Sequence, residues 1–162
     1  MIENCNTFGI EFVFSVSPGL DLVFHSQQDY DQLLKKFQQL KDLGCRSFAV
    51  LWDDINAELQ GVDAKGIDLK QFKPINRSFL SDSLSFKSLT VFESPGVAQC
   101  YISNSLFEAL SPCKYFMMCP TEYCGAFAQP NVQDSKYLKD LGEKLHQEIE
   151  IMWTGPRLIG KT

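Results

Sequence analysis

Two adjacent carboxylates, Asp53 and Asp54, follow the apolar run Ser47 to Trp52 directly, in the segment SFAVLWDDIN. Carboxylates at the end of a buried strand are costly unless they are paired, hydrogen-bonded or used in chemistry. When two carboxyl groups are neighbours, one can hold a proton while the other stays ionised, which suits general acid–base catalysis. The spacing alone equally allows one of these aspartates to cap the segment that follows.

A tyrosine stands in a comparable place in the segment KYFMMCPTEYCGAF. Pro120 ends the apolar run Tyr115 to Cys119 because proline cannot donate to a strand ladder. Tyr123 would then donate a hydrogen bond to a substrate oxygen or serve as an aromatic lid, and the spacing leaves both roles open. Glu122 is predicted to be a hydrogen-bond or ion-pair partner rather than an acid catalyst.

The elements that position these residues alternate along the chain. Four nearly continuous apolar runs predict buried strands, and three amphipathic patterns predict the helices between them. The strands are Ile10 to Val16, Ser47 to Trp52, Tyr115 to Cys119 and Ile149 to Trp153; the helices are Tyr30 to Leu43, entered through Ser26 or Asp29 and left at Gly44, Val97 to Leu110, and Ser135 to Gln147 with Asp134 as N-cap. This order predicts an α/β fold with right-handed βαβ units and a parallel sheet.

Composition excludes several classes of protein. The net charge of -5 and the scattered basic residues argue against nucleic acid as a partner. No apolar run reaches the roughly 20 residues that span a bilayer, and the polar start lacks the features of a signal peptide, so a cytoplasmic or nuclear location is expected. The six cysteines form no CxxC pair and the two histidines are isolated, so neither a metal nor a cofactor is expected.

Three segments together resemble one known family. FVFSVSPGLDLVF, GCRSFAVLWDDIN and CPTEYCGAFAQPNV, followed by YLKDLGEKL and IEIMWTGP, are similar to the catalytic domain of glycoside hydrolase family 84, the O-GlcNAcase family. The resemblance covers nearly all of residues 1–162 except the stretch 66–89. It implies a TIM-type (β/α)₈ barrel and a β-N-acetylglucosaminidase that removes O-linked N-acetylglucosamine from Ser and Thr of cytoplasmic and nuclear proteins, without a metal.

The resemblance also assigns roles to the three candidate residues. The reaction it implies is substrate-assisted and retaining, because the 2-acetamido oxygen of the sugar attacks the anomeric carbon and forms an oxazoline. Asp54 would be the general acid and base, and Asp53 would orient and polarise the acetamido group. Tyr123 matches the tyrosine of the family that helps to bind this group.

The chain departs from the family pattern in two respects. It matches only the third to sixth strands, which predicts a partial barrel of about four β/α units that is inactive on its own. The stretch 66–89 has no sustained period and is interpreted either as an inserted loop or as translated intron sequence. An alternative from another class is a non-catalytic scaffold or binding protein built on a truncated barrel.

Overall fold

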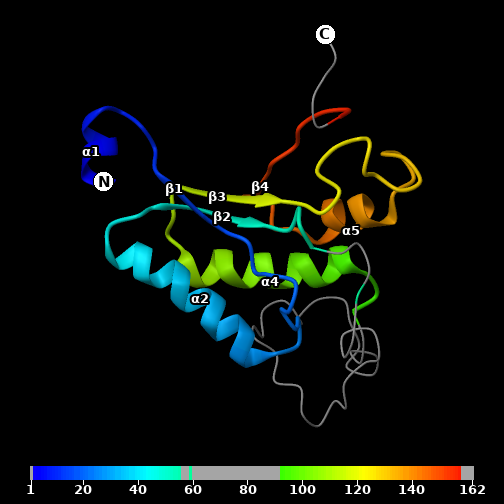
Figure 1. Ribbon diagram of the computed structural model, residues 1–162, viewed down its shortest axis with the longest axis horizontal. Coiled ribbons are helices and arrows are strands. Elements are labelled where there is room, and N and C mark those ends of the chain that lie inside the picture. Colours follow the sequence, from blue (N-terminus) through cyan, green and yellow to red (C-terminus); the bar gives the residue numbers. More distant parts are fainter. Residues whose placement is uncertain (1, 56–58, 60–91, 158–162) are drawn as a thin grey trace.

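The structure is a computed structural model that describes residues 2–55, 59 and 92–157. Strands and helices alternate after a short N-terminal helix (Figure 1). The elements in chain order are α1 (Ile2–Thr7), β1 (Val13–Val16), α2 (Gln27–Asp42), β2 (Ser47–Leu51), α4 (Pro95–Leu110), β3 (Tyr115–Cys119), α5 (Lys136–Lys144) and β4 (Glu150–Ile151).

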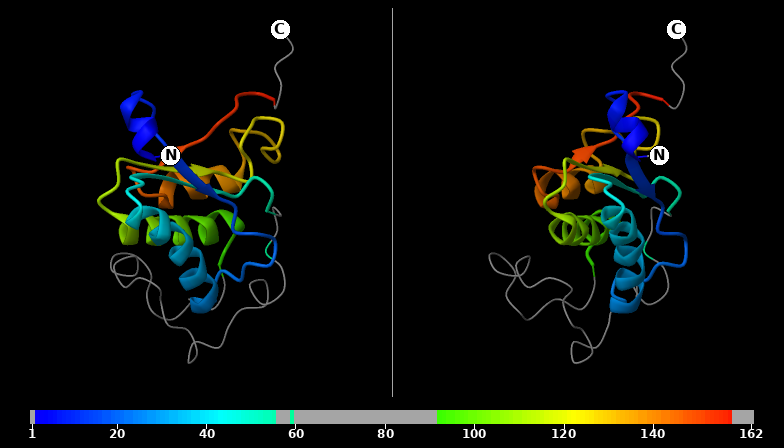
Figure 2. Two further views of the ribbon diagram at one scale, coloured as in Figure 1. Left: turned by 60° about the vertical axis from the view of Figure 1, so that its left-hand side comes forward. Right: turned by 90° about the vertical axis from the view of Figure 1, so that its left-hand side faces the viewer.

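The four strands form one parallel sheet in the order β1-β2-β3-β4, so that each strand pairs with its neighbour in sequence. Helices α2, α4 and α5 all lie on the same side of this sheet (Figures 1 and 2). A doubly wound fold would place helices on both sides, whereas a sheet that is wound in one direction with helices on one side is part of a barrel wall. The predicted α/β fold and parallel sheet are therefore confirmed.

The core lies between the sheet and its helices. Phe14, Phe48 and Phe116 are register partners on adjacent strands, so their side chains point to the same face. Phe37 of α2 packs edge-on against the rings of Phe14 and Phe48, with centroid distances of 5.8 and 5.9 Å. Phe107 of α4 contacts Phe116 in the same way at 5.9 Å. This aromatic layer fixes the helices to the sheet.

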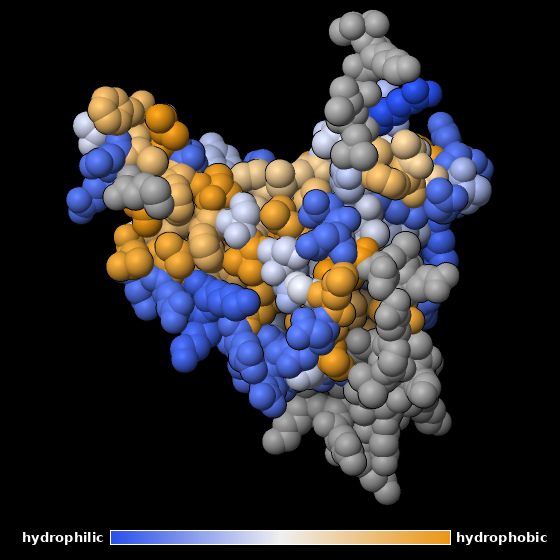
Figure 3. Space-filling view, viewed as in Figure 1, coloured by the Kyte–Doolittle hydropathy of each residue, from blue (hydrophilic) through white to orange (hydrophobic). Residues whose placement is uncertain are grey.

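The opposite side of the sheet is covered much less. Figure 3 shows apolar residues gathered over the strands and α1, above the hydrophilic outer surface of α2. Tyr115, Ile151, Met152 and Trp153 on or beside β3 and β4 are 40–48% exposed. An open sheet with this much apolar surface at its edge is what an incomplete barrel wall presents.

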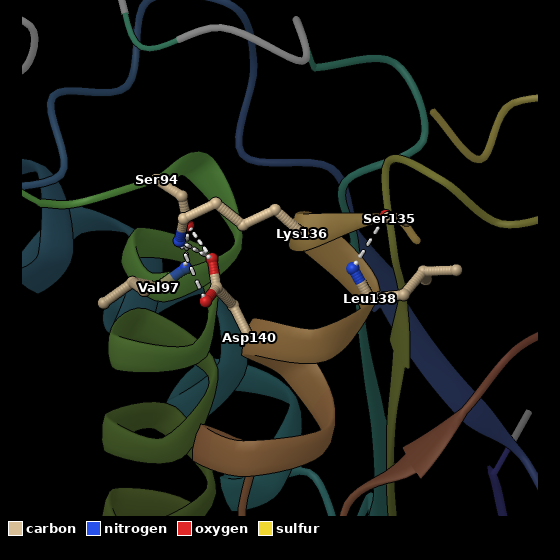
Figure 4. Close-up of polar contacts among 6 residues, drawn as sticks. All are labelled: Ser94, Val97, Ser135, Lys136, Leu138 and Asp140. Carbon is tan, nitrogen blue, oxygen red and sulfur yellow. Dashed lines mark hydrogen bonds and ion pairs between the residues drawn. The ribbon is translucent and has the colours of Figure 1, made fainter. Parts of the chain in front are cut away.

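Two serines are the N-caps of helices α4 and α5 (Figure 4). Ser94 accepts a hydrogen bond from the Val97 N–H at 3.2 Å and caps α4, which therefore starts at Pro95, two residues before the prediction. Ser135 caps α5 by accepting from the Leu138 N–H at 3.0 Å. The prediction that Asp134 is this N-cap is wrong, because the helix begins one residue later than that role requires.

Other boundaries also differ from the prediction. β1 starts at Val13 instead of Ile10, β4 is limited to Glu150–Ile151, and α5 ends at Lys144 rather than Gln147. The short helix α1 was not predicted, since its sequence IENCNT has no apolar period. The entry and exit of α2 at Ser26 and Gly44 are confirmed, with Gly44 at a φ of 92°. The stretch 66–89 lies outside the described residues.

Candidate active site

The segment that carries the two aspartates leaves β2 from a fully buried anchor. Trp52 has no exposed surface, its N–H donates to the Cys119 carbonyl at 2.8 Å, and its indole N–H donates to Ser103 Oγ at 3.2 Å. The first bond extends the β2–β3 ladder by one residue, and the second ties the strand end to α4. Asp53 and Asp54 are exposed beyond this anchor.

A buried polar network joins this strand end to the next one. Thr121 Oγ1 donates to the Trp52 carbonyl at 2.9 Å and accepts from Gln99 Nε2 at 2.9 Å. The Tyr137 hydroxyl in turn accepts from the Thr121 N–H at 2.9 Å and donates to Gln99 Oε1. Fully satisfied buried networks of this kind specify one arrangement, so the carboxyl ends of β2 and β3 are fixed relative to each other.

Asp54 points toward the end of β1. Its carboxylate accepts the hydroxyl of Ser17 at 2.8 Å on Oδ1 and 3.0 Å on Oδ2. Ser17 directly follows β1, whose last residue Val16 is the register partner of Val50. The contact therefore spans the carboxyl ends of two neighbouring strands, although the residues are 37 apart in sequence.

The charge of Asp53 acts on two groups at the end of β3. Burial raises the pKa of the Cys119 thiol to about 11, and the charge of Asp53 adds to this shift. Burial also raises the pKa of the Tyr123 hydroxyl, with further contributions from Cys124 and Asp53. Both groups therefore stay protonated near neutral pH: the thiol is no nucleophile, and the Tyr123 hydroxyl remains a hydrogen-bond donor.

The loop that carries Tyr123 is held by hydrogen bonds of the buried Glu122 side chain and of the Tyr123 carbonyl. Glu122 is buried and accepts the Ser135 hydroxyl at 2.5 Å and the Gln129 N–H at 3.4 Å, which confirms its predicted role as a hydrogen-bond partner. The Tyr123 carbonyl accepts the Thr154 N–H at 3.0 Å, and its ring lies 5.1 Å from that of Phe127. The hydroxyl end of Tyr123 has no hydrogen-bond partner among the described residues.

The structure brings the predicted residues to one face and adds others that the sequence reasoning missed. Asp53, Asp54 and Tyr123 all follow the carboxyl ends of β2 and β3. Ser17, Gln99 and Ser103 were not predicted to take part. The polar pair Gln99 and Ser103, four residues apart beside the apolar stripe of α4, was a signal that could have revealed the network.

Two further interpretations of this face concern a cap and a metal. A helix cap by Asp53 or Asp54 would involve residues 56 and 57, outside the described part of the chain. Within residues 2–55, 59 and 92–157, no group of three His, Cys, Asp or Glu side chains is placed to hold a metal ion. In the same residues no helix is long and apolar enough to cross a membrane. This face carries two exposed, adjacent carboxylates and a protonated tyrosine.

Comparison with known proteins identifies the family. A family model described as beta-N-acetylglucosaminidase matches residues 1–162. The chain belongs to the β-N-acetylglucosaminidase family. It is 36% identical over 161 residues to the protein O-GlcNAcase of Mus musculus and 35% identical over 161 residues to that of Rattus norvegicus. These alignments cover 99% of the chain but only 15% of either relative.

A solved structure extends the likeness to the fold. A mutant of the O-GlcNAc hydrolase of Thermobaculum terrenum superimposes with a TM-score of 0.70 and 26% sequence identity. The match covers 98% of this chain and 29% of that one. The four-stranded sheet described above thus has the arrangement of part of a β-N-acetylglucosaminidase barrel, and the resemblance found in the sequence is confirmed.

Proposed function

We propose that this chain supplies the acid–base part of an enzyme that removes β-O-linked N-acetylglucosamine from Ser and Thr of proteins. Family membership and the names of the mouse, rat and Thermobaculum terrenum relatives support this substrate class. The observation that carries the proposal is the contact of Asp54 with Ser17 at the end of β1, beside Asp53, whose charge contributes to the raised pKa of Cys119 and of Tyr123 at the end of β3. Two adjacent carboxylates that face different neighbours can take two different roles.

The first half of the proposed reaction uses all three residues. Asp53 accepts the acetamido N–H, which makes the acetamido oxygen a better nucleophile toward the anomeric carbon. Tyr123 donates a hydrogen bond to the same group, consistent with its raised pKa and with the charge of Asp53 acting on it. As the bond to the leaving oxygen breaks, protonated Asp54 gives that oxygen its proton, and an oxazoline forms whose N–H proton is shared with Asp53 until the ring opens again.

The second half regenerates the enzyme. Asp54, now a carboxylate, removes a proton from a water molecule that attacks the anomeric carbon from the side the leaving group occupied. The carbon–oxygen bond of the oxazoline breaks, the acetamido group is restored, and the β configuration is retained. No step needs a metal or an organic cofactor.

A fluorogenic N-acetylglucosaminide tests the proposal with the full-length gene product that carries this chain. Asp54→Asn should reduce turnover by about 10²–10⁴-fold, the typical contribution of general acid–base catalysis. Replacing the acetamido methyl with a trifluoromethyl group should slow the wild-type enzyme as well, because it weakens the acetamido oxygen as a nucleophile. Equal rates for wild type and Asp54→Asn would refute the proposal.

The 162 residues expressed alone are expected to turn over little or no substrate. The described sheet has free edges at β1 and β4 and exposed apolar side chains at Tyr115 and Met152. Residues 2–55, 59 and 92–157 therefore form neither a closed barrel nor a closed sugar pocket. Robust hydrolysis by this segment alone would contradict the expectation. Specific binding of N-acetylglucosamine analogues by the full-length product without any turnover would instead favour the alternative, a scaffold or binding protein.

The partners and location follow from the same proposal. The substrates would be cytoplasmic and nuclear proteins that carry O-linked N-acetylglucosamine. All six cysteines are free thiols, among them the buried Cys45, Cys100 and Cys124, which suits a reducing compartment. Fluorescence imaging of the tagged full-length product tests this location, and an exclusively secreted product would contradict it.

A further inference from the structure

The hydrogen bond between Ser17 and Asp54 can hold the Asp54 carboxyl group in one orientation. One hydroxyl lies within 2.8 and 3.0 Å of the two carboxylate oxygens. Among the described residues, Ser17 is the sole hydrogen-bond donor to Asp54. Because Asp54 is exposed, this hydrogen bond favours one rotamer of its side chain over the others.

The backbone around Ser17 is itself restricted. Pro18 follows it, and a residue before proline is confined to extended conformations. Gly19 then turns the chain with a φ of 92°, a region that other residues rarely adopt. A side chain at this glycine would also meet Asp21 Oδ1 at 2.9 Å. The backbone on both sides of Pro18 therefore has little conformational freedom, and this limits the positions that the Ser17 hydroxyl can take.

We propose that Ser17 is a positioning residue for Asp54, a role that rests on the function proposed above. A general acid has to reach the leaving oxygen within hydrogen-bond distance, about 2.6–3.2 Å, as the bond breaks. While Asp54 is protonated, the hydroxyl of Ser17 donates to its unprotonated oxygen, and the other oxygen presents the proton to the substrate. After proton transfer, the same hydroxyl holds the carboxylate that activates water.

Ser17 acts on only one of the two aspartates. Asp53 accepts no hydrogen bond among the described residues, and its charge acts on Cys119 and Tyr123 at the end of β3. Loss of the Ser17 hydroxyl should therefore weaken the acid–base step and leave the orientation of the acetamido group unchanged. This difference separates a positioning role from a general loss of structure.

The test compares variants of the full-length gene product on aryl N-acetylglucosaminides whose phenol leaving groups differ in acidity. Ser17→Ala should lower kcat about tenfold for the poorest leaving group and much less for the best one, with KM changed less than about twofold. Ser17→Thr keeps a hydroxyl and should restore most of the rate. Thr7→Ala in α1, which removes an exposed hydroxyl bonded to the Glu3 carbonyl, is the control and should behave as wild type.

The outcomes separate this inference from the proposed function. A rate loss that is equal for all leaving groups, a Ser17→Ala variant as active as wild type, or no rescue by threonine would overturn the positioning role. If wild type and Asp54→Asn have the same rate, the proposed function has failed and this inference fails with it. Melting curves accompany each variant, and if Ser17→Ala does not fold, Ser17→Cys, whose thiol is a weak donor, replaces it.

Discussion

At the amino ends of the strands, the carboxylate of Glu11 accepts hydrogen bonds from Lys114 and Ser47, both at 2.5 Å. At the carboxyl ends, Asp54 accepts hydrogen bonds from Ser17 alone among the residues that the structure describes. Lys114 is the main reason why the pKa of Glu11 lies below its usual value, with Ser47 second. No cation pairs with Asp53 or Asp54 among the described residues. The same chemical group is thus neutralised at one end of the sheet and left available at the other.

This difference agrees with a general property of barrel folds. Polar residues at the carboxyl ends of barrel strands serve chemistry, and those at the amino ends serve stability. Glu11 fits the second case because its partners satisfy both of its oxygens. Asp53 and Asp54 fit the first, because an ionisable group without a counter-ion remains able to bind substrate or exchange a proton.

The largest effect is expected from exchanging one carboxylate for an amide at each end. Asp54→Asn should lower kcat for an N-acetylglucosaminide by about 10²–10⁴-fold and leave the melting temperature nearly unchanged. Glu11→Gln, the matched change at the amino ends, should leave kcat within about twofold of wild type. Similar losses of activity in both variants would remove the distinction between the two ends.

Asp53→Asn should cost about 10²-fold in kcat, because a poorly oriented acetamido group attacks inefficiently. A trifluoromethyl group in place of the acetamido methyl should slow this variant by a smaller factor than it slows wild type. Rates on the natural and fluorinated substrates measure the sensitivity. If the fluorinated substrate slows both proteins by the same factor, Asp53 does not act on this group.

Removing the central hydroxyl of the buried network should destabilise the protein. Thr121→Val removes the hydroxyl bond to the Trp52 carbonyl and leaves the Gln99 Nε2 amide without its acceptor, at a cost of about 1–3 kcal/mol in the free energy of unfolding. Thr7→Val in α1 is the control: its hydroxyl bond to the Glu3 carbonyl is exposed, and the expected change is below about 0.5 kcal/mol. Equal denaturant midpoints for both variants would show that the network does not stabilise the strand ends.

The smallest effect concerns the pH dependence at the amino ends. Because the pKa of Glu11 is lowered in the folded protein, its stabilisation is present above the ordinary value of 4.5 and is lost as the pH falls through the lower folded value. Glu11→Gln should therefore melt less than about 4 °C below wild type at pH 7. This difference should shrink in acid and in high salt. A difference that grows in acid would contradict the ion pair with Lys114.

The sequence predicted the parts of the fold that depend on local pattern. The run before Asp53 is continuously apolar and is followed by two charges, so both β2 and the place of the aspartates could be inferred. Ser26 and Gly44 bound α2 because capping depends on residues within one helical turn. The resemblance to a known family then supplied separate roles for the carboxylates.

What could not be predicted depends on contacts between distant residues. Ser17 meets Asp54 only because β1 and β2 pair in one register, which a slip of one residue would abolish. In the sequence, Gln99 is a polar interruption of an apolar helix. Its partners Thr121 and Tyr137 are distant along the chain, and only the fold brings them beside it. Helix α1 has no amphipathic pattern of its own.

The most direct test of separate roles measures kcat/KM of Asp54→Asn and Asp53→Asn on aryl N-acetylglucosaminides that span a range of leaving-group acidity. The deficit of Asp54→Asn should grow as the leaving group becomes less acidic, because such a group needs a proton to depart. The deficit of Asp53→Asn should stay nearly constant across the series. Equal dependence on leaving-group acidity in the two variants would contradict the assignment of acid–base catalysis to Asp54 alone.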